Sequence, residues 1–256
     1  MTFKIQVGTI YAAYYPFSDL TQSKKRPVLA VQEADAYGDV KVVFITSQSV
    51  KTEQGFALNS EDFDGTPLPL DSSVRTDKSF SLHLSKIEKP VAKLTYKAFE
   101  RVLRSVINQQ VTGFAAHKYQ TADFEPGETV VPPSGKVIGA TELQYMVEAS
   151  LDGWLTTGRF NDQFEKELAE FIGIKHLITV NSGSSANLVA FSTLTSPKLG
   201  NRAIKKGDEV IAVAAGFPTT VNPIVQFGAV PVFVDVDLKT HNINADLIEA
   251  AITPKT

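Results

Sequence analysis

Basic and hydroxyl side chains gather at a point where the sequence could bind a phosphodiester. Lys24, Lys25 and Arg26 form a turn between two apolar runs, and the run VKVVFITSQ ends in the hydroxyls of Thr46 and Ser47. A guanidinium suits a phosphate because it donates two parallel hydrogen bonds and stays charged at any working pH. The residues alone leave a second interpretation open, a solvated positive turn beside an ordinary strand end.

A second phosphate-binding pattern occurs in LITVNSGSSANLVAF, where an apolar run leads into Gly183, Ser184 and Ser185 at the start of a predicted helix. Backbone N–H groups and the helix dipole at such a turn attract anions, and serine hydroxyls add donors. A Gly/Ser turn that only caps a helix has the same pattern, so the motif by itself does not establish a binding site.

Short strands must position the basic residues 24–26 and the hydroxyl residues 46–47. Residues 3–85 contain runs rich in Val, Ile, Tyr and Phe that are bounded by Gly, Pro, Asp or Ser, which predicts a small all-β barrel or sandwich. Apolar residues at helical spacing predict one helix over 95–110, with Thr95 as its N-cap. We therefore expect a first domain over residues 1–112.

The pattern changes after this domain. Residues 113–133 lose periodicity and contain acidic residues, prolines and glycines, which indicates a linker or an extended arm. Residues 134–256 alternate predicted helices with apolar strands, which is typical of βαβ units and a parallel sheet. The expected strands are 177–180, 209–214 and 231–237, and the expected helices are 141–155, 161–174, 185–195 and 244–252.

Composition excludes several classes of protein. The chain has no cysteine, so it can form neither a disulfide nor a thiolate metal site. No apolar run approaches bilayer length and the amino terminus lacks signal-peptide sections, so we expect a cytoplasmic protein without membrane contact. The net charge of -3 combines a small positive excess before Gly113 with a negative excess after it, which suggests two modules with separate partners.

The first domain resembles the MazF/PemK toxin endoribonucleases. The similarity is carried by GTIYAAYYPFSDLTQSKKRPVLAVQ, VVFITSQ, SVRTDKSFSLHLSKI and the closing helix, and it covers residues 1–112. The resemblance implies an SH3-like barrel that forms a homodimer and cuts single-stranded RNA without a metal or cofactor. It also implies a cognate antitoxin as a partner.

The resemblance also assigns roles to individual residues. The arginine of the KRP turn and the threonine of the ITS strand end form the catalytic pair of that family, and these match Arg26 and Thr46. Arg26 would stabilise charge on the phosphorane, and Thr46 would position the nucleophile or the phosphate. The candidates for RNA binding are Lys24, Lys25, Ser47 and Arg75.

Aromatic residues near the amino end could stack on RNA bases. They are Tyr11, Tyr14, Tyr15 and Phe17. Alternation within a strand would bury some of them, so we expect about one of them to contact RNA.

Residues 113–256 resemble the DegT/DnrJ/EryC1/StrS sugar aminotransferases, and among them the CDP-4-keto-6-deoxyglucose 3-dehydratases of O-antigen biosynthesis. The similarity runs from PPSGKVIGATELQYM through the SGSSAN turn to PVFVDVD. It implies part of a fold-type I pyridoxal-phosphate transferase domain. In that family Gly183, Ser184 and Ser185 match the coenzyme's phosphate turn, Phe217 matches the aromatic that stacks on its ring, and 154–159 match a nearby loop.

The chain departs from this second family because it stops at Thr256. The family's pyridinium-binding aspartate and Schiff-base lysine, or the histidine and iron–sulfur cysteines of the dehydratases, come later in the sequence. We therefore expect a catalytically incomplete domain with a vestigial site for pyridoxal or pyridoxamine phosphate.

The sequence thus predicts a multidomain protein whose main activity is that of a toxin endoribonuclease. The alternative function is that of a coenzyme-dependent sugar-nucleotide aminotransferase or 3-dehydratase fragment, completed by another polypeptide. A third interpretation is a gene rearrangement that joined a toxin frame to a broken dehydratase gene.

Overall fold

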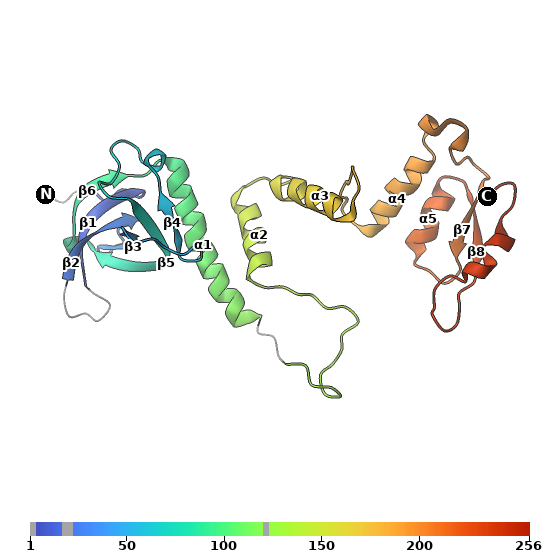
Figure 1. The fold of residues 1–256 in the computed structure, drawn as a ribbon, viewed down its shortest axis with the longest axis horizontal. Coiled ribbons are helices and arrows are strands. Elements are labelled where there is room, and N and C mark those ends of the chain that lie inside the picture. The colour runs from blue at the N-terminus through green and yellow to red at the C-terminus, as the bar shows by residue number, and fades with distance from the viewer. Residues whose placement is uncertain (1–3, 17–22, 120–122) are drawn as a thin grey trace. The chain divides into compact units, whose positions relative to one another are not determined.

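The computed structural model describes residues 4–16, 23–119 and 123–256, which divide into two compact units, residues 1–156 and 157–256 (Figure 1). The first unit contains a six-stranded antiparallel sheet in the order β4-β5-β3-β2-β1-β6. Its strands are β1 (Thr9–Pro16), β2 (Ser23–Ala30), β3 (Asp39–Thr46), β4 (Gly55–Leu58), β5 (Ser72–His83) and β6 (Ile87–Lys93).

Both faces of this sheet are buried because apolar residues occupy successive positions of the strands. One face carries Ile10, Leu29 and Val43, and the other carries Tyr11 and Val28, all almost fully buried. Each face forms its own core cluster, as expected for a strongly coiled sheet rather than a flat one.

The expected SH3-like barrel is not confirmed, because the described strands do not close into a ring. The segment after β4 meets the end of β6 at one place, where Phe63 forms an isolated bridge with Leu94 and the Asp64 N–H donates to the Lys93 carbonyl at 2.8 Å. A short 3-10 turn, Ser60–Asp62, separates β4 from this bridge, and β4 itself does not pair with β6.

Helix α1 (Tyr96–Lys118) follows β6 and is longer than the sequence predicted. The Thr95 hydroxyl caps it by accepting a hydrogen bond from the Ala98 N–H at 3.3 Å, as expected for an N-cap. Ala98 and Val102 enter the core cluster of Ile10 and Leu29, so the first turns of α1 cover one face of the sheet (Figure 1).

Helix α2 (Ala140–Leu151) also belongs to the first unit, because it packs against α1. The first residues of the expected linker, 113–118, belong instead to the end of α1. Residues 123–139 have neither helix nor strand.

The second unit contains a small βαβ arrangement. Strands β7 (Glu209–Val213) and β8 (Val230–Val234) pair in parallel, with α5 (Pro218–Gln226) between them in sequence. Helices α3 (Arg159–Ile172) and α4 (Gly183–Leu194) precede them. The expected parallel pairing is confirmed for these two strands.

Two expected elements of the second unit are absent from its described residues. Residues 177–180 form no strand, because α3 takes their hydrogen bonds: Glu165 accepts from the Thr179 N–H at 2.8 Å and the Thr179 hydroxyl donates to Asn161 at 2.6 Å. The helix expected over 244–252 is replaced by two 3-10 turns, Ala245–Leu247 and Glu249–Ala251.

Candidate active site

One cavity of the first unit, of about 430 Å³, brings together four of the predicted site residues. Lys24 and Arg26 line it from β2, and Thr46 and Ser47 line it from the end of β3. Strand register explains the approach, because Val28 pairs with Phe44 and the same antiparallel register, continued by two residues, sets Arg26 opposite Thr46. Directly opposed residues share a face, so the guanidinium and the hydroxyl lie on one side of the sheet.

The hydroxyl of Thr46 is held by the turn that follows β3. It accepts a hydrogen bond from the Gln48 N–H at 3.1 Å, and Gln48 also lines the cavity. A hydroxyl that accepts this bond keeps its own proton to donate. Thr46 therefore keeps a hydroxyl proton for a further hydrogen bond.

Three consecutive apolar residues form an apolar wall of the cavity. It consists of Leu68, Pro69 and Leu70, directly before β5. The Ser72 hydroxyl donates to the Leu70 carbonyl at 2.8 Å, which fixes the turn into the strand. The lining of the cavity therefore combines cationic, hydroxyl and apolar side chains.

Lys25 is not among the residues that line this cavity. It forms an ion pair with Glu88 of β6, and its ammonium lies 5.9 Å from the centre of the Tyr14 ring. The hydrogen bond to Glu88 raises the pKa of Lys25 above its ordinary value. Because neighbours in a strand point to opposite faces, Lys25 and Arg26 serve different sides of the sheet.

Arg75 is also absent from the cavity lining, although β5 pairs it with Phe44 on the face that carries Thr46. Its guanidinium donates two hydrogen bonds to Asp77, at 2.7 and 2.6 Å. The hydrogen bond from Arg75 lowers the pKa of Asp77 below its ordinary value. Asp77 thus holds the group that was predicted to bind RNA.

The aromatic cluster divides between core and surface. Tyr11 is buried, and its hydroxyl accepts a hydrogen bond from the Gln6 N–H at 2.9 Å, whereas Tyr14 is exposed beside Lys25. The side chain of Tyr15 and the whole of Phe17 lie outside the described residues.

The described ranges show neither a metal site nor a membrane span. In residues 4–16, 23–119 and 123–256, no three His, Asp or Glu side chains are grouped so that they could hold a metal ion. Within the same part of the chain, no helix combines the length and apolar character needed to cross a bilayer.

The predicted phosphate turn of the second unit lies at the amino end of α4. The Ser182 hydroxyl caps this helix by accepting from the Ser185 N–H at 3.2 Å, and Gly183 and Ser184 follow the cap. The Asn187 amide donates to the Thr219 carbonyl at 3.4 Å, which ties the first turn of α4 to the first turn of α5. Phe217 occupies the N-cap position of α5 and is 73% exposed, so its ring is accessible.

Sequence reasoning missed Gln48 and the apolar wall. A threonine hydroxyl often accepts from the backbone N–H two residues later, so the strand-ending Thr46 could have indicated a turn that includes Gln48. The wall comes from the run Pro67-Leu68-Pro69-Leu70, which has no periodicity and therefore gave no signal of a site.

The comparisons with known proteins match two different families on this chain. Residues 6–109 match the family described as "PemK-like, MazF-like toxin of type II toxin-antitoxin system". Residues 136–256 match the DegT/DnrJ/EryC1/StrS aminotransferase family. The chain therefore joins a PemK/MazF-like toxin region to part of a DegT-type sugar aminotransferase region.

Individual relatives specify the second region further. The lipopolysaccharide biosynthesis protein RfbH of Salmonella typhimurium is 67% identical over 154 residues, which cover 60% of this chain and 35% of that protein. A dTDP-4-dehydro-2,6-dideoxy-D-glucose 3-dehydratase of Saccharopolyspora spinosa is 46% identical over 159 residues, which cover 62% of this chain and 33% of that protein. The chain spans about a third of the length of these relatives.

A solved structure of GDP-4-keto-6-deoxymannose-3-dehydratase with a trapped PLP-glutamate geminal diamine is also similar. It is 32% identical, with a TM-score of 0.46, over 49% of this chain and 32% of that protein.

Proposed function

We propose that the first region is a metal-independent endoribonuclease of the toxin–antitoxin type. The observation that carries this proposal is the shared cavity of Arg26 and Thr46, within a region that matches PemK/MazF-like toxins. The proposal includes the features of that family expected above: an SH3-like arrangement of the sheet, a homodimer, a single-stranded RNA substrate and an antitoxin partner.

The cavity supports cleavage by the RNA's own 2′-hydroxyl. The 2′ oxygen forms a bond to the adjacent phosphorus, the bond to the 5′ oxygen breaks, and the proton of the 2′-hydroxyl is balanced by protonation of the leaving oxygen. Arg26 donates to the phosphorane oxygens as negative charge develops on them. Thr46 orients the phosphate through its hydroxyl proton, and Lys24 and Ser47 hold the neighbouring backbone.

The test uses the full chain with Arg26→Ala and, as a matched control, Lys25→Ala. The control removes a cation from the next position of the same strand, outside the cavity lining. Loss of a group that stabilises the transition state lowers the cleavage rate by about 10²–10³. We expect this loss for Arg26→Ala and not for the control Lys25→Ala. Thr46→Val should lower the rate too. A wild-type chain that does not cut single-stranded RNA, or an Arg26→Ala chain that cuts it equally fast, would refute the proposal.

The amino end of α4 supports a second function, binding of pyridoxal or pyridoxamine phosphate by the second unit. The first backbone N–H groups of a helix suit a phosphate, and space beside Gly183 is open. Ser184 and Ser185 would add hydroxyl donors, and the exposed Phe217 ring would stack on the coenzyme. When bound, such a coenzyme supplies an electron sink for reactions at carbon atoms next to an amine.

An absorbance titration with pyridoxal phosphate tests this binding directly. We expect a band that survives dialysis in the wild-type chain and weakens in Ser184→Ala/Ser185→Ala. Ser192→Ala, near the other end of α4, is the control and should bind as the wild type does. Complete loss of the band from the wild type on dialysis would rule out a functional site in this chain.

A further inference from the structure

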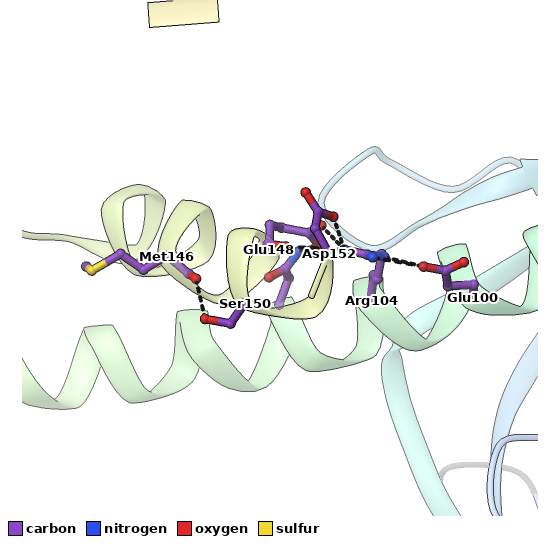
Figure 2. A network of polar contacts seen from close by, with 7 residues as sticks. Glu100, Arg104, Met146, Glu148, Ser150 and Asp152 are labelled. Carbon is purple, nitrogen blue, oxygen red and sulfur yellow. Dashed lines mark hydrogen bonds and ion pairs between the residues drawn. The ribbon is translucent and has the colours of Figure 1, made fainter. Parts of the chain in front are cut away.

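The contact between α1 and α2 is organised around Arg104 of α1. Its guanidinium donates to Glu148 at 2.8 Å, pairs with Asp152 at 3.1 Å and also pairs with Glu100 of its own helix at 2.8 Å (Figure 2). The side chains of Arg104, Glu148 and Asp152 are only 21%, 18% and 25% exposed. Charged groups that give up this much solvent require well-aligned partners, and here each has one.

Uncharged hydrogen bonds extend the contact along both helices. The Asn108 amide donates to the second carboxylate oxygen of Glu148 at 2.8 Å. One turn further along α1, the Gln144 amide donates to the Thr112 hydroxyl at 2.8 Å. The carboxylate of Glu148 is therefore bound on both oxygens, and α2 is attached along two turns of α1.

Two separate similarities overlap on α1. The toxin match continues to residue 109. The match to RfbH covers 154 residues, which is more than the stretch from Gly113 to Thr256, so it reaches back at least to Leu103 even if it ends at the last residue. The two matches overlap on this helix, whose early residues Ala98 and Val102 pack in the core of the sheet.

We propose that α2 and the C-terminal part of α1 form a latch, a contact that holds the start of the aminotransferase-like region on the toxin-like unit. The ion pairs of Arg104 are the centre of this contact. The toxin-like match continues into α1, and α2, which precedes most of the aminotransferase-like match, packs against that helix. The occupant of this face of α1 is therefore the chain's own acidic helix. No residue of α1 or α2 is among the described residues that line the cavity of Arg26 and Thr46, so the latch does not cover that cavity.

The latch can be tested by cutting the loop in the intact, folded chain. A specific protease site is inserted between Ser134 and Gly135, where the backbone is exposed and forms neither helix nor strand. After cleavage, size-exclusion chromatography at low salt reports whether the two fragments stay together. We expect the wild-type fragments to co-elute and to separate as salt is raised, because exposed parts of the ion pairs are screened.

The deciding variant is Glu148→Gln/Asp152→Asn, which removes the two carboxylates that pair with Arg104 from the α2 side and leaves the sheet untouched. We expect its fragments to associate about tenfold more weakly or worse, since charge-assisted hydrogen bonds are about twice as strong as neutral ones. Glu128→Gln removes one charge from the loop and should behave as the wild type. Hydrogen exchange before cleavage should show faster exchange over 140–151 only, with β3 and β5 unchanged, which verifies that the variant is folded.

Two results would overturn the latch. The wild-type fragments could separate at low salt as readily as those of the variant, or the variant fragments could stay together as firmly as those of the wild type. Either result would show that Arg104 and its carboxylates do not fasten α2 to α1.

Discussion

The two units differ in how completely their sheets are buried. The six-stranded sheet of the first unit has a core cluster on each face, with more than a dozen almost fully buried apolar side chains. The two-stranded sheet of the second unit has a single cluster of four buried residues: Phe191, Ala212, Ile224 and Ala229. Among the described residues the second unit also exposes large apolar side chains, including Phe171, Ile178 and Phe233.

This difference bears on what each unit can position accurately. Arg26 lies within β2, two residues before the buried Val28, and Thr46 ends β3 directly after the buried Ile45, so their relative placement follows from strand register. The SGSS turn lies on a helix with only Phe191 in the core, and the adjoining Phe217 is exposed. We therefore expect the first site to be the more rigid, because precise sites depend on packed supporting residues.

Hydrogen exchange should show the largest difference between the units. Central strands of a packed sheet open only with global unfolding, whereas a two-stranded sheet with few buried contacts opens locally. We expect amides of β3 to be protected at least about a thousandfold more than those of β8. Equal protection in the two strands would contradict the expected difference in stability between the two sheets and show that β7 and β8 share a larger core.

Matched core substitutions should show the next largest effect. Leu29→Ala creates a cavity beneath α1, and such changes cost about 2–5 kcal/mol in a closely packed core. Ile224→Ala removes a similar volume from the small cluster, whose partly exposed surroundings can collapse or admit water, so we expect the lower end of that range or less. Chemical denaturation followed by circular dichroism measures both, with the exposed Val91→Ala as a control expected to change little. A larger loss for Ile224→Ala would contradict this ranking.

The sequence predicted the elements whose pattern is local. The N-cap at Thr95 and the parallel strands around α5 depend on neighbouring residues, and the structure contains them. The strand expected at 177–180 is absent, because a strand needs a neighbour to pair with and α3 supplies side-chain partners instead. Pairing of this kind depends on residues distant in sequence, which periodicity does not reveal.

The candidate site shows the same difference between features that depend on local sequence and features that depend on distant residues. Residue type and resemblance predict Arg26 and Thr46 as the catalytic pair, and both residues line one cavity. Lys25 is adjacent in sequence to Arg26 but serves the other face, and Asp77 engages Arg75. The sequence could not identify Glu88 as the partner of Lys25 or Asp77 as the partner of Arg75. Glu88 is distant in sequence from Lys25, and Asp77 reaches Arg75 at a bulge of β5 that only the fold creates.

The ion pair of Arg75 and Asp77 should make a smaller, pH-dependent contribution to the first unit. The pKa of Asp77 is lowered in the folded state, so the pair stabilises the fold above the ordinary carboxyl pKa of about 3.9, and this contribution disappears as pH falls through the lowered value. We expect Asp77→Asn to lose unfolding free energy at neutral pH and to differ less from the wild type in acid. The exposed Asp71→Asn is the control. A constant difference between Asp77→Asn and the wild type at every pH would contradict this role.

Glu165 should have the smallest effect, since it acts at the surface of the second unit. Hydrogen bonds from the Thr179 N–H and hydroxyl lower its pKa, so the carboxylate holds residues 177–180 against α3 above the ordinary glutamate pKa of about 4.3 and releases them as pH falls. We expect Glu165→Gln to reduce protection of the Thr179 amide a few-fold at neutral pH, after correction for the intrinsic exchange rate. Glu170→Gln on the same helix should leave it unchanged. If both variants behave alike, the carboxylate of Glu165 does not hold this segment, and another contact must take its place in the second unit.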